Sequence, residues 1–268
     1  MRPSTRLVVL GKKLWTPAQI STALWLDAAD ASTITLNGST VSQWNDKSGN
    51  GRNATQATAA NQPVLATNSQ NGQNGITFDG VNDYLVFSSA LLQTTHSLFI
   101  VFKPTIKSVT GTVFGQWAPG QTGRYLWNVN QNCLGVTASG RLNVFNSTST
   151  QGGCSEGLAT DVDISNTATL IESLSTTGTE QWKLFKNGTE WESSTITSVY
   201  TEINSSIGSL NATTSNNPYD GIVYEVIHLS TYASTTDRQL IEGYLAWKWE
   251  LTANLLNNHP FKFNPPLA

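Results

Sequence analysis

Short apolar runs separated by polar turn residues fill the middle of the chain. In residues 97–103 the apolar side chains occupy both alternating sets of positions, which is typical of a strand packed on both faces. Residues 182–186 and 189–192 are two such runs joined by Asn187-Gly188, a pair that accepts the positive φ angles of a tight hairpin turn. The pattern predicts many antiparallel strands, the others at residues 112–116, 124–129, 134–137, 141–145, 169–174, 203–207 and 222–229.

One segment near the end of the chain has helical periodicity. Ser234 followed by Asp237 resembles a capping box. Apolar residues then recur every three or four positions, at Leu240, Ile241, Tyr244, Leu245 and Trp249. We therefore expect a helix at about residues 235–251 that packs on the sheets. The prolines at 260, 265 and 266 predict an extended tail after it.

Composition narrows the function classes. The chain has 268 residues, 38% hydrophobic and 12% charged, with a net charge of −3. This charge argues against nucleic acid as a partner, since binding to phosphates needs a basic surface. No apolar run approaches the roughly 18 residues of a membrane-spanning helix, so we expect no membrane insertion.

The two cysteines, Cys133 and Cys154, can form a disulfide bridge or stay reduced, and the sequence leaves both possibilities open.

Three local motifs carry a family resemblance. The first joins LWLDAAD (residues 24–30) to WNDKSGNG (44–51), the second is ITFDGVNDYL (76–85), and the third is RQLIEGYLAWKW (238–249). In this order they resemble the concanavalin A-like lectin/glucanase superfamily, in the LamG-like jelly-roll branch of phage and bacterial surface proteins. The resemblance implies a two-sheet antiparallel jelly-roll sandwich over residues 23–268, preceded by an N-terminal arm at 1–22. Related sequences usually have Gly at the position of Glu250, so we expect the helix to run on further here.

Catalysis is not predicted. Glucanases of this superfamily carry two glutamates that bracket an aspartate on one strand, and this motif is absent. Glu190 and Glu192 share one face of a strand, but the alternative is an ordinary solvent face beside a turn. The sequence has no Ser or Cys nucleophile motif near any of its histidines, which are His96, His228 and His259. It therefore does not support a catalytic triad. We expect a non-catalytic protein.

Calcium is the one cofactor that the resemblance raises. Jelly-roll relatives often hold Ca²⁺ near loop carboxylates and amides, and Asp46, Asn50, Asp79 and Asp83 are hard oxygen ligands on two loops. The alternative is that these side chains accept hydrogen bonds from backbone N–H groups of their own turns.

A glycan site is the third candidate. Sugars stack their apolar faces on aromatic rings, while polar side chains bind their hydroxyl edges. Residues 115–125 combine Trp117, Arg124 and Tyr125 with Gly, Gln and Thr, which makes these three residues candidate ligands. The alternative is that they pack or form a turn.

The sequence thus favours a binding or coating protein. Our main expectation is a structural protein of a phage or viral virion, either capsid-decorating or tail-associated, whose partners are other virion proteins. The alternative is a glycan-binding adhesion module that binds a host-surface glycan from an extracellular or cell-surface position. The apolar arm residues Leu7, Val9 and Trp15 are candidate contacts to a partner or to a second copy in a homo-oligomer. Equally, the arm can complete a sheet edge of its own domain.

Overall fold

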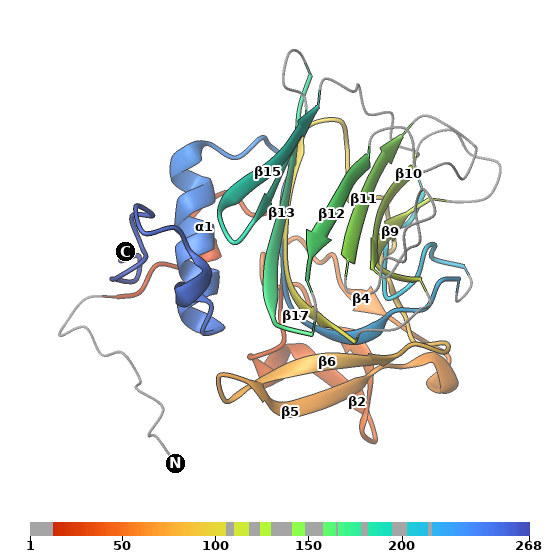
Figure 1. Ribbon diagram of the computed structural model, residues 1–268. Coiled ribbons are helices and arrows are strands. Elements are labelled where there is room, and N and C mark those ends of the chain that lie inside the picture. The colour runs from red at the N-terminus through yellow and green to blue at the C-terminus, as the bar shows by residue number, and fades with distance from the viewer. Residues whose placement is uncertain are drawn as a thin grey trace.

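The protein is an antiparallel β-sandwich with one α-helix laid against it (Figure 1). The computed structural model describes residues 13–105, 110–117, 124–129, 141–147, 158–164, 166–177, 182–194, 203–213 and 216–268. These ranges contain β1 (Leu24–Asp27), β2 (Ile34–Asn37), β3 (Thr40–Trp44), β4 (Ala54–Thr55), β5 (Val64–Gln70), β6 (Gln73–Asp79), β7 (Leu85–Val86), β8 (His96–Pro104), β9 (Gly111–Gln116), β10 (Arg124–Val129), β11 (Arg141–Ser147), β12 (Leu158–Asp163), β13 (Thr169–Ser175), β14 (Trp182–Lys186), β15 (Thr189–Ser194), β16 (Ser206–Ile207), β17 (Asp220–Leu229) and the helix α1 (Thr235–Lys248).

Strand pairing builds two layers. The helix-side sheet has the order β1–β17–β8–β13–β14–β15, and every pair in it is antiparallel. The far sheet has the order β7–β16–β9–β10–β11–β12. The hairpins of β2, β3, β5 and β6 lie together below these sheets in Figure 1, and β6 joins them to the start of β17. The predicted all-β sandwich with a single C-terminal helix is confirmed.

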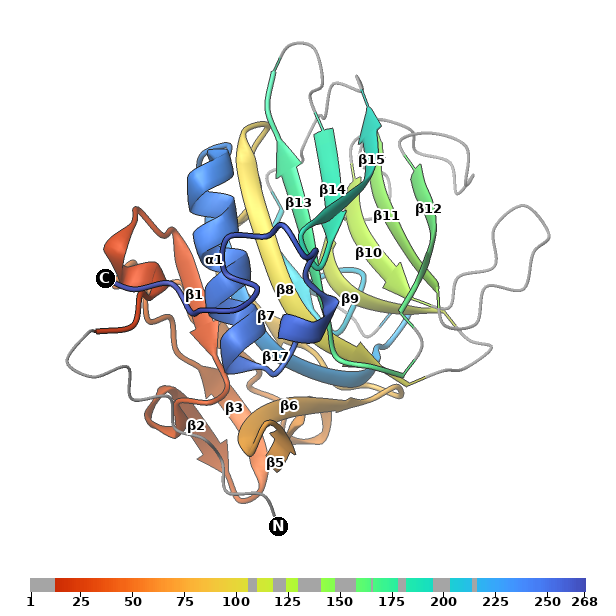
Figure 2. The ribbon, with the colours of Figure 1, turned by 60° about the vertical axis from the view of Figure 1, so that its left-hand side comes forward.

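Strand β8 lies in the middle of three layers, which are the far sheet, the helix-side sheet and α1. Leu98, Ile100 and Phe102 point between the two sheets, where they join the main apolar core. Phe99 and Val101 point the other way, into a second apolar cluster that includes Ile241, Leu245 and Trp249 of the helix region. The doubly apolar pattern of residues 97–103 is therefore explained by burial under the far sheet on one face and under α1 on the other (Figure 2).

The helix begins as predicted and ends earlier than predicted. Ser234 is the N-cap, and its Oγ accepts a hydrogen bond of 3.1 Å from the backbone N–H of Asp237. The last helical residue is Lys248, and Trp249 is the C-cap. Glu250 has a φ of 58°, so it takes the left-handed conformation that glycine usually supplies after a helix. The expectation that Glu250 lets the helix run on is wrong, because the residue terminates the helix in a glycine-like conformation.

The tail after the helix is folded, which corrects the predicted extended tail. A 3-10 turn at Thr252–Asn254 follows α1, and Lys262 Nζ donates to the backbone carbonyls of Ala253 and Leu255. In Figure 2 the tail runs back across the outer side of α1. Within the described ranges, no helix combines the length and the apolar character that a membrane crossing requires.

The N-terminal residues 13–22 belong to the domain. Leu14 forms an antiparallel bridge with Leu267, and the Trp15 N–H donates to the Pro266 carbonyl at 3.1 Å. The Trp15 ring is buried edge-on against Tyr244. Its own helix and tail therefore cover Trp15, as in the alternative in which the arm packs on its own domain, and a partner contact through Trp15 stays a prediction. Leu7 and Val9 lie outside the described residues, as do Cys133, Cys154 and the strand predicted at residues 134–137.

Candidate functional site

The end of the β9–β10 hairpin brings together the residues predicted to bind a ligand. Trp117 directly follows β9, while Arg124 and Tyr125 begin β10. The backbone of Tyr125 lies opposite Gln116 in the antiparallel ladder, so all three residues meet at one end of the far sheet. The side chains of Arg124 and Tyr125 are outside the described part of the structure.

Trp117 differs from the other eight tryptophans, all of which lie in the described ranges. Six of them are buried. Of the three that are partly exposed, Trp191 packs against the inter-sheet core and Trp247 donates its indole N–H to the Phe261 carbonyl. Trp117 belongs to neither apolar cluster. Its Nε1 is shielded from water without a hydrogen-bond partner, as are the Nε1 atoms of Trp44 and Trp191, so its distinguishing feature is the partly exposed ring outside the clusters. The exposed part of this indole is a surface that the apolar face of a sugar ring can complement.

The residue before Trp117 holds this site in place. Gln116 is buried, and its Oε1 accepts hydrogen bonds from the backbone N–H groups of Leu91 and Leu92 at 3.1 and 2.9 Å. Its Nε2 donates to the Leu92 carbonyl at 2.9 Å, and Ser205 Oγ donates to its Oε1 at 2.7 Å. Gln116 thus ties β9 to two loops, which gives Trp117 the rigid support that a preorganised binding residue needs.

Asp46 and Asn50, two of the predicted calcium ligands, fix their own turn. Asp46 Oδ1 accepts from the backbone N–H groups of Trp25 and Ser48, both at 2.9 Å, and its Oδ2 accepts from that of Arg52 at 3.1 Å. Asn50 Nδ2 donates to the carbonyls of Thr22 and Ala23. The carboxylate therefore holds the loop after β3 onto β1.

The second predicted pair acts in the same way. Asp79 Oδ1 accepts from the backbone N–H groups of Val81 and Asn82, and Asp83 Oδ2 accepts from that of Asp79 at 3.0 Å. Burial, with the neighbouring Asp79 charge, raises the pKa of Asp83 to about 6. Among the described residues no group of three or more His, Cys, Asp or Glu side chains is arranged to hold a metal ion. The structure thus assigns these residues turn-forming roles, and calcium binding stays a prediction.

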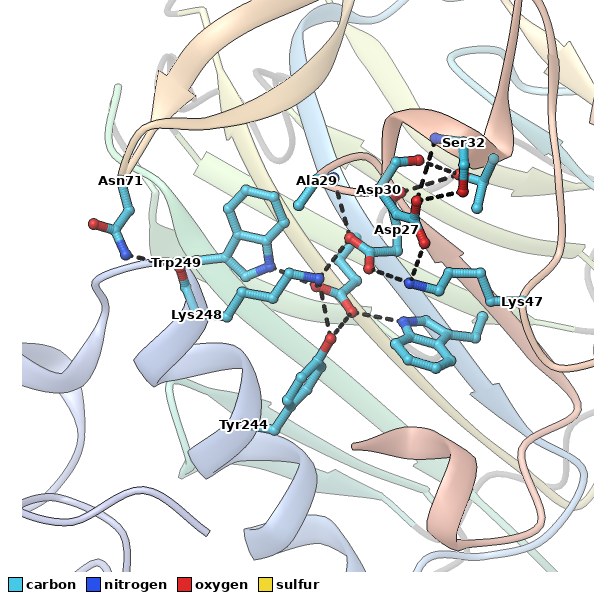
Figure 3. A network of polar contacts seen from close by, with 12 residues as sticks. Asp27, Ala29, Asp30, Ser32, Lys47, Asn71, Tyr244, Lys248 and Trp249 are labelled. Atoms are coloured by element: carbon cyan, nitrogen blue, oxygen red, sulfur yellow. Dashed lines mark hydrogen bonds and ion pairs between the residues drawn. The ribbon is translucent and has the colours of Figure 1, made fainter. Parts of the chain in front are cut away.

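Lys248, Asp27 and Tyr244 belong to a polar network between β1 and α1 (Figure 3), and a buried carboxylate of the helix-side sheet lies at its centre. Glu225 of β17 is fully buried. Its Oε1 accepts from Trp25 Nε1 at 2.7 Å and from the Tyr244 hydroxyl at 2.9 Å. Its Oε2 accepts from Trp249 Nε1 at 2.7 Å and pairs with Lys248 Nζ at 2.8 Å. Burial raises the pKa of Glu225, and the Lys248 charge opposes this shift.

Asp27 of β1 extends this network. Lys248 Nζ lies 2.5 Å from its Oδ1, and Lys47 Nζ lies 2.8 Å from its Oδ2. Lys47 also pairs with Asp30 at 2.8 Å and sits over the Trp25 ring. This ion pair lowers the pKa of Asp30 to about 2. Residues of the first and third sequence motifs thus meet in one place, where they connect β1, β17 and α1.

A second buried carboxylate pair was missed by the sequence reasoning. Glu172 of β13 and Glu242 of α1 are both fully buried, and Arg238 and His259 surround them. The Gly188 N–H donates to Glu172 at 3.1 Å, and His259 Nε2 lies 2.8 Å from Glu242. Burial, reinforced by Glu242, raises the pKa of Glu172 well above its ordinary value. A glutamate inside an otherwise apolar strand, TLIESL, was the available signal for a buried partner.

The described carboxylates and histidines form no open acid–base site. Glu190 is exposed on β15, where its carboxylate lies 3.5 Å from Lys183 Nζ, and a β-bulge shifts the register beside it. His96 and His228 are buried with ring centroids 6.3 Å apart. Burial lowers the pKa of His96 to about 4 and that of His228 well below its ordinary value. Both imidazoles are thus neutral and sealed from any substrate.

Comparison with solved structures finds similar β-sandwich folds. The botulinum neurotoxin serotype D ligand-binding domain in complex with N-acetylneuraminic acid is similar, with a TM-score of 0.55 and 12% identity over 83% of this chain and 50% of that chain. The Trypanosoma rangeli sialidase in complex with sialic acid has a TM-score of 0.57 and 12% identity over 88% of this chain and 36% of that chain.

The botulinum neurotoxin type G receptor-binding domain gives a TM-score of 0.51 and 12% identity, over 81% of this chain and 50% of that chain. The chain therefore spans half or less of each of these three structures, and at this identity the likeness shows the fold alone. No protein-family model matches the chain, and no curated protein sequence is significantly similar to it.

Proposed function

We propose that this protein is a non-catalytic glycan-binding module whose ligand stacks on Trp117 at the end of the β9–β10 hairpin. The observation that carries the proposal is the Trp117 indole, which is partly exposed and lies outside both apolar clusters. The exposed part of this ring offers the apolar surface on which the C–H face of a sugar can stack.

The comparisons support this proposal at the level of the fold. Two of the similar structures hold sialic acid in their complexes. Because unrelated functions share one fold, the sugar and its position cannot be transferred to this chain. The likeness nevertheless favours the glycan-binding alternative over the role as a virion structural protein, which remains a prediction from the sequence. A module of this kind works where glycans are displayed, at a cell or virion surface.

A screen on immobilised glycans tests the proposal. We expect the full chain to bind a subset of glycans, and Trp117→Ala to reduce that binding at least tenfold, because the stacking surface is lost. Phe263→Ala is the matched control, since Phe263 is an exposed aromatic residue on the tail beside α1, away from the far sheet. If Trp117→Ala binds as well as the unmodified chain, the site is elsewhere. If no glycan binds, the proposed function is wrong.

A further inference from the structure

Lys248 and Asp27 form an ion pair, and their side chains are also an amine and a carboxyl group that can react with each other. Lys248 Nζ lies 2.5 Å from Asp27 Oδ1, which puts the nitrogen beside the carboxyl carbon. Intramolecular reactions between groups held about 3 to 3.5 Å apart can reach effective concentrations of about 10⁵ to 10⁸ M. An amine and a carboxyl held in this way can condense to an amide without any other reactant.

A third group is placed to move the protons. Glu225 Oε2 lies 2.8 Å from Lys248 Nζ, and the Tyr244 hydroxyl accepts from the same nitrogen at 3.0 Å while donating to Glu225 Oε1 at 2.9 Å. The two indole N–H donors of Trp25 and Trp249 fix both oxygens of Glu225. The carboxylate is therefore held against the amine in one orientation, as a proton carrier must be.

The surroundings favour condensation over hydrolysis. Glu225 is fully buried, the Asp27 side chain is 5% exposed and the Lys248 side chain 17%. The rings of Trp25, Tyr244 and Trp249 cover the cluster, as Figure 3 shows for the labelled Tyr244 and Trp249. Water released in such a site leaves it, and little water is available to reverse the reaction.

The other contacts of Asp27 suit the developing charge. Lys47 Nζ lies 2.8 Å from Oδ2, so its positive charge stabilises an oxyanion on that atom. The Ala29 N–H donates to Oδ1 at 3.0 Å and fixes the plane of the carboxyl group. Oδ1 then faces Lys248 and is the oxygen that leaves.

We propose that Lys248 and Asp27 condense spontaneously into an intramolecular amide bond, with Glu225 as the catalytic proton carrier. The Lys248 ammonium passes a proton through Glu225 to Asp27 Oδ1, and the neutral amine attacks Cγ. The Nζ–Cγ bond forms and the Cγ–Oδ1 bond breaks. Two of the three ammonium protons leave with Oδ1 as water, one stays on the amide nitrogen, and Glu225 returns to its starting state.

The same contacts select Lys248 over the second amine. Lys47 also touches Asp27, but its other side-chain contacts are an ion pair with Asp30 and the face of the Trp25 ring, whereas Lys248 contacts Glu225 directly. Lys47 thus lacks the buried proton carrier that Lys248 has. The product would tie β1 to the last turn of α1 covalently, across a loop that contains most of the domain. This link requires no glycan site, so it stands or falls independently of the proposed function.

Mass spectrometry of the full chain, purified folded and then denatured, tests the proposal. We expect the intact mass to be lower than the sequence mass by one water molecule, and a digest to contain one cross-linked peptide that joins Asp27 to Lys248. Lys248→Arg keeps the positive charge and should restore the full mass. Glu225→Gln keeps the size of the proton carrier and should prevent or greatly slow the loss of water. Lys47→Arg is the matched control and should retain the cross-link.

The unmodified chain decides the question even if the Glu225 variant fails to fold. A full sequence mass after prolonged incubation of the folded chain at neutral pH would overturn the proposal. Loss of water that maps to a Lys47 cross-link, or to a cyclised aspartate with no cross-linked peptide, would overturn it as well. A cross-link that persists in a folded Glu225→Gln variant at the unmodified rate would remove Glu225 from the reaction.

Discussion

Trp249 Nε1 donates a 2.7 Å hydrogen bond to Glu225 Oε2, and both residues are completely buried. This bond connects the C-cap of α1 to the middle of β17, so the only α-helix in the described ranges is docked through a polar contact inside an apolar layer. An unsatisfied buried carboxylate is costly, which makes the orientation of α1 depend on this contact as well as on packing.

Two substitutions at Trp249 separate these contributions. Trp249→Phe keeps most of the buried ring and removes the N–H donor, so it should lower the free energy of unfolding by about 1 to 3 kcal/mol. Trp249→Ala also leaves a cavity and should cost about 3 to 5 kcal/mol. Urea denaturation measures both values. A change of less than about 1 kcal/mol for the alanine variant would mean that α1 is not docked through Trp249.

Glu172 predicts a decline of stability with increasing pH. Its pKa is raised in the folded state, chiefly by burial and then by Glu242. A group with a raised folded pKa contributes stability that is present below its unfolded value and is lost as the pH rises through the folded value. The loss should therefore begin above about 4.5, the ordinary value. Asp83, with a pKa of about 6, adds a similar loss over the lower part of this range.

The Glu172→Gln variant isolates that effect. Glutamine keeps the size of the side chain and can still accept the hydrogen bond from Gly188, but it cannot ionise. We expect its free energy of unfolding to fall less steeply above about pH 7, beyond the titration of Asp83, than that of the unmodified chain. If the free energy of unfolding depends on pH in the same way in both proteins, the pKa of Glu172 is not raised in the folded state.

Glu250 offers a stabilising substitution. Its φ of 58° is unfavourable for a residue with a Cβ and free for glycine. Glu250→Gly should raise the free energy of unfolding by about 0.5 to 1 kcal/mol, whereas Glu250→Ala should give no such gain, since alanine retains the Cβ. Thermal and urea unfolding of both variants check this. Equal stability of the glycine and alanine variants would contradict the left-handed assignment.

Asp46 distinguishes a turn-forming role from a calcium site. Its carboxylate accepts three backbone hydrogen bonds, so Asp46→Ala should destabilise the domain by about 2 to 4 kcal/mol. Asp46→Asn retains one acceptor oxygen and should lose less. If turn formation is the whole role, a chelator leaves the melting temperature of the unmodified chain unchanged. A chelator-dependent fall that the Asp46→Asn variant lacks would instead support the calcium prediction.

Much of the fold could be predicted from local sequence patterns. The capping residues Ser234 and Asp237, the Asn187-Gly188 turn and the doubly apolar β8 all specify structure through near neighbours, so their patterns were sufficient. The end of the helix was predicted wrongly because Glu250 takes a conformation that its residue type disfavours. The tail was predicted wrongly because prolines exclude regular structure without excluding turns that pack on a helix.

The polar clusters depend on contacts that no local pattern encodes. Asp27, Glu225 and Lys248 come from distant segments and meet because β1 and α1 both pack beside β17. The motifs that contain Asp27 and Lys248 indicated a family resemblance, but only the fold shows that the two residues lie together. Glu225 lies within the apolar run IVYEVIHL, as Glu172 does within TLIESL, and each signalled a buried partner that the sequence could not name. For Trp117 the sequence indicated the residue, and the structure added its partial exposure outside both apolar clusters.

The most direct test of glycan binding observes the Trp117 indole itself. In a ¹⁵N-labelled chain each of the nine tryptophans has an indole N–H signal in the NMR spectrum, and Trp117→Phe assigns that of Trp117 by its loss. The chain is then titrated with a glycan that the screen on immobilised glycans identifies. The Trp117 signal should move more than those of the buried Trp127 and Trp182, and the Trp117→Phe variant should bind the glycan more weakly. Binding that leaves the Trp117 signal in place while another indole signal moves would contradict the account.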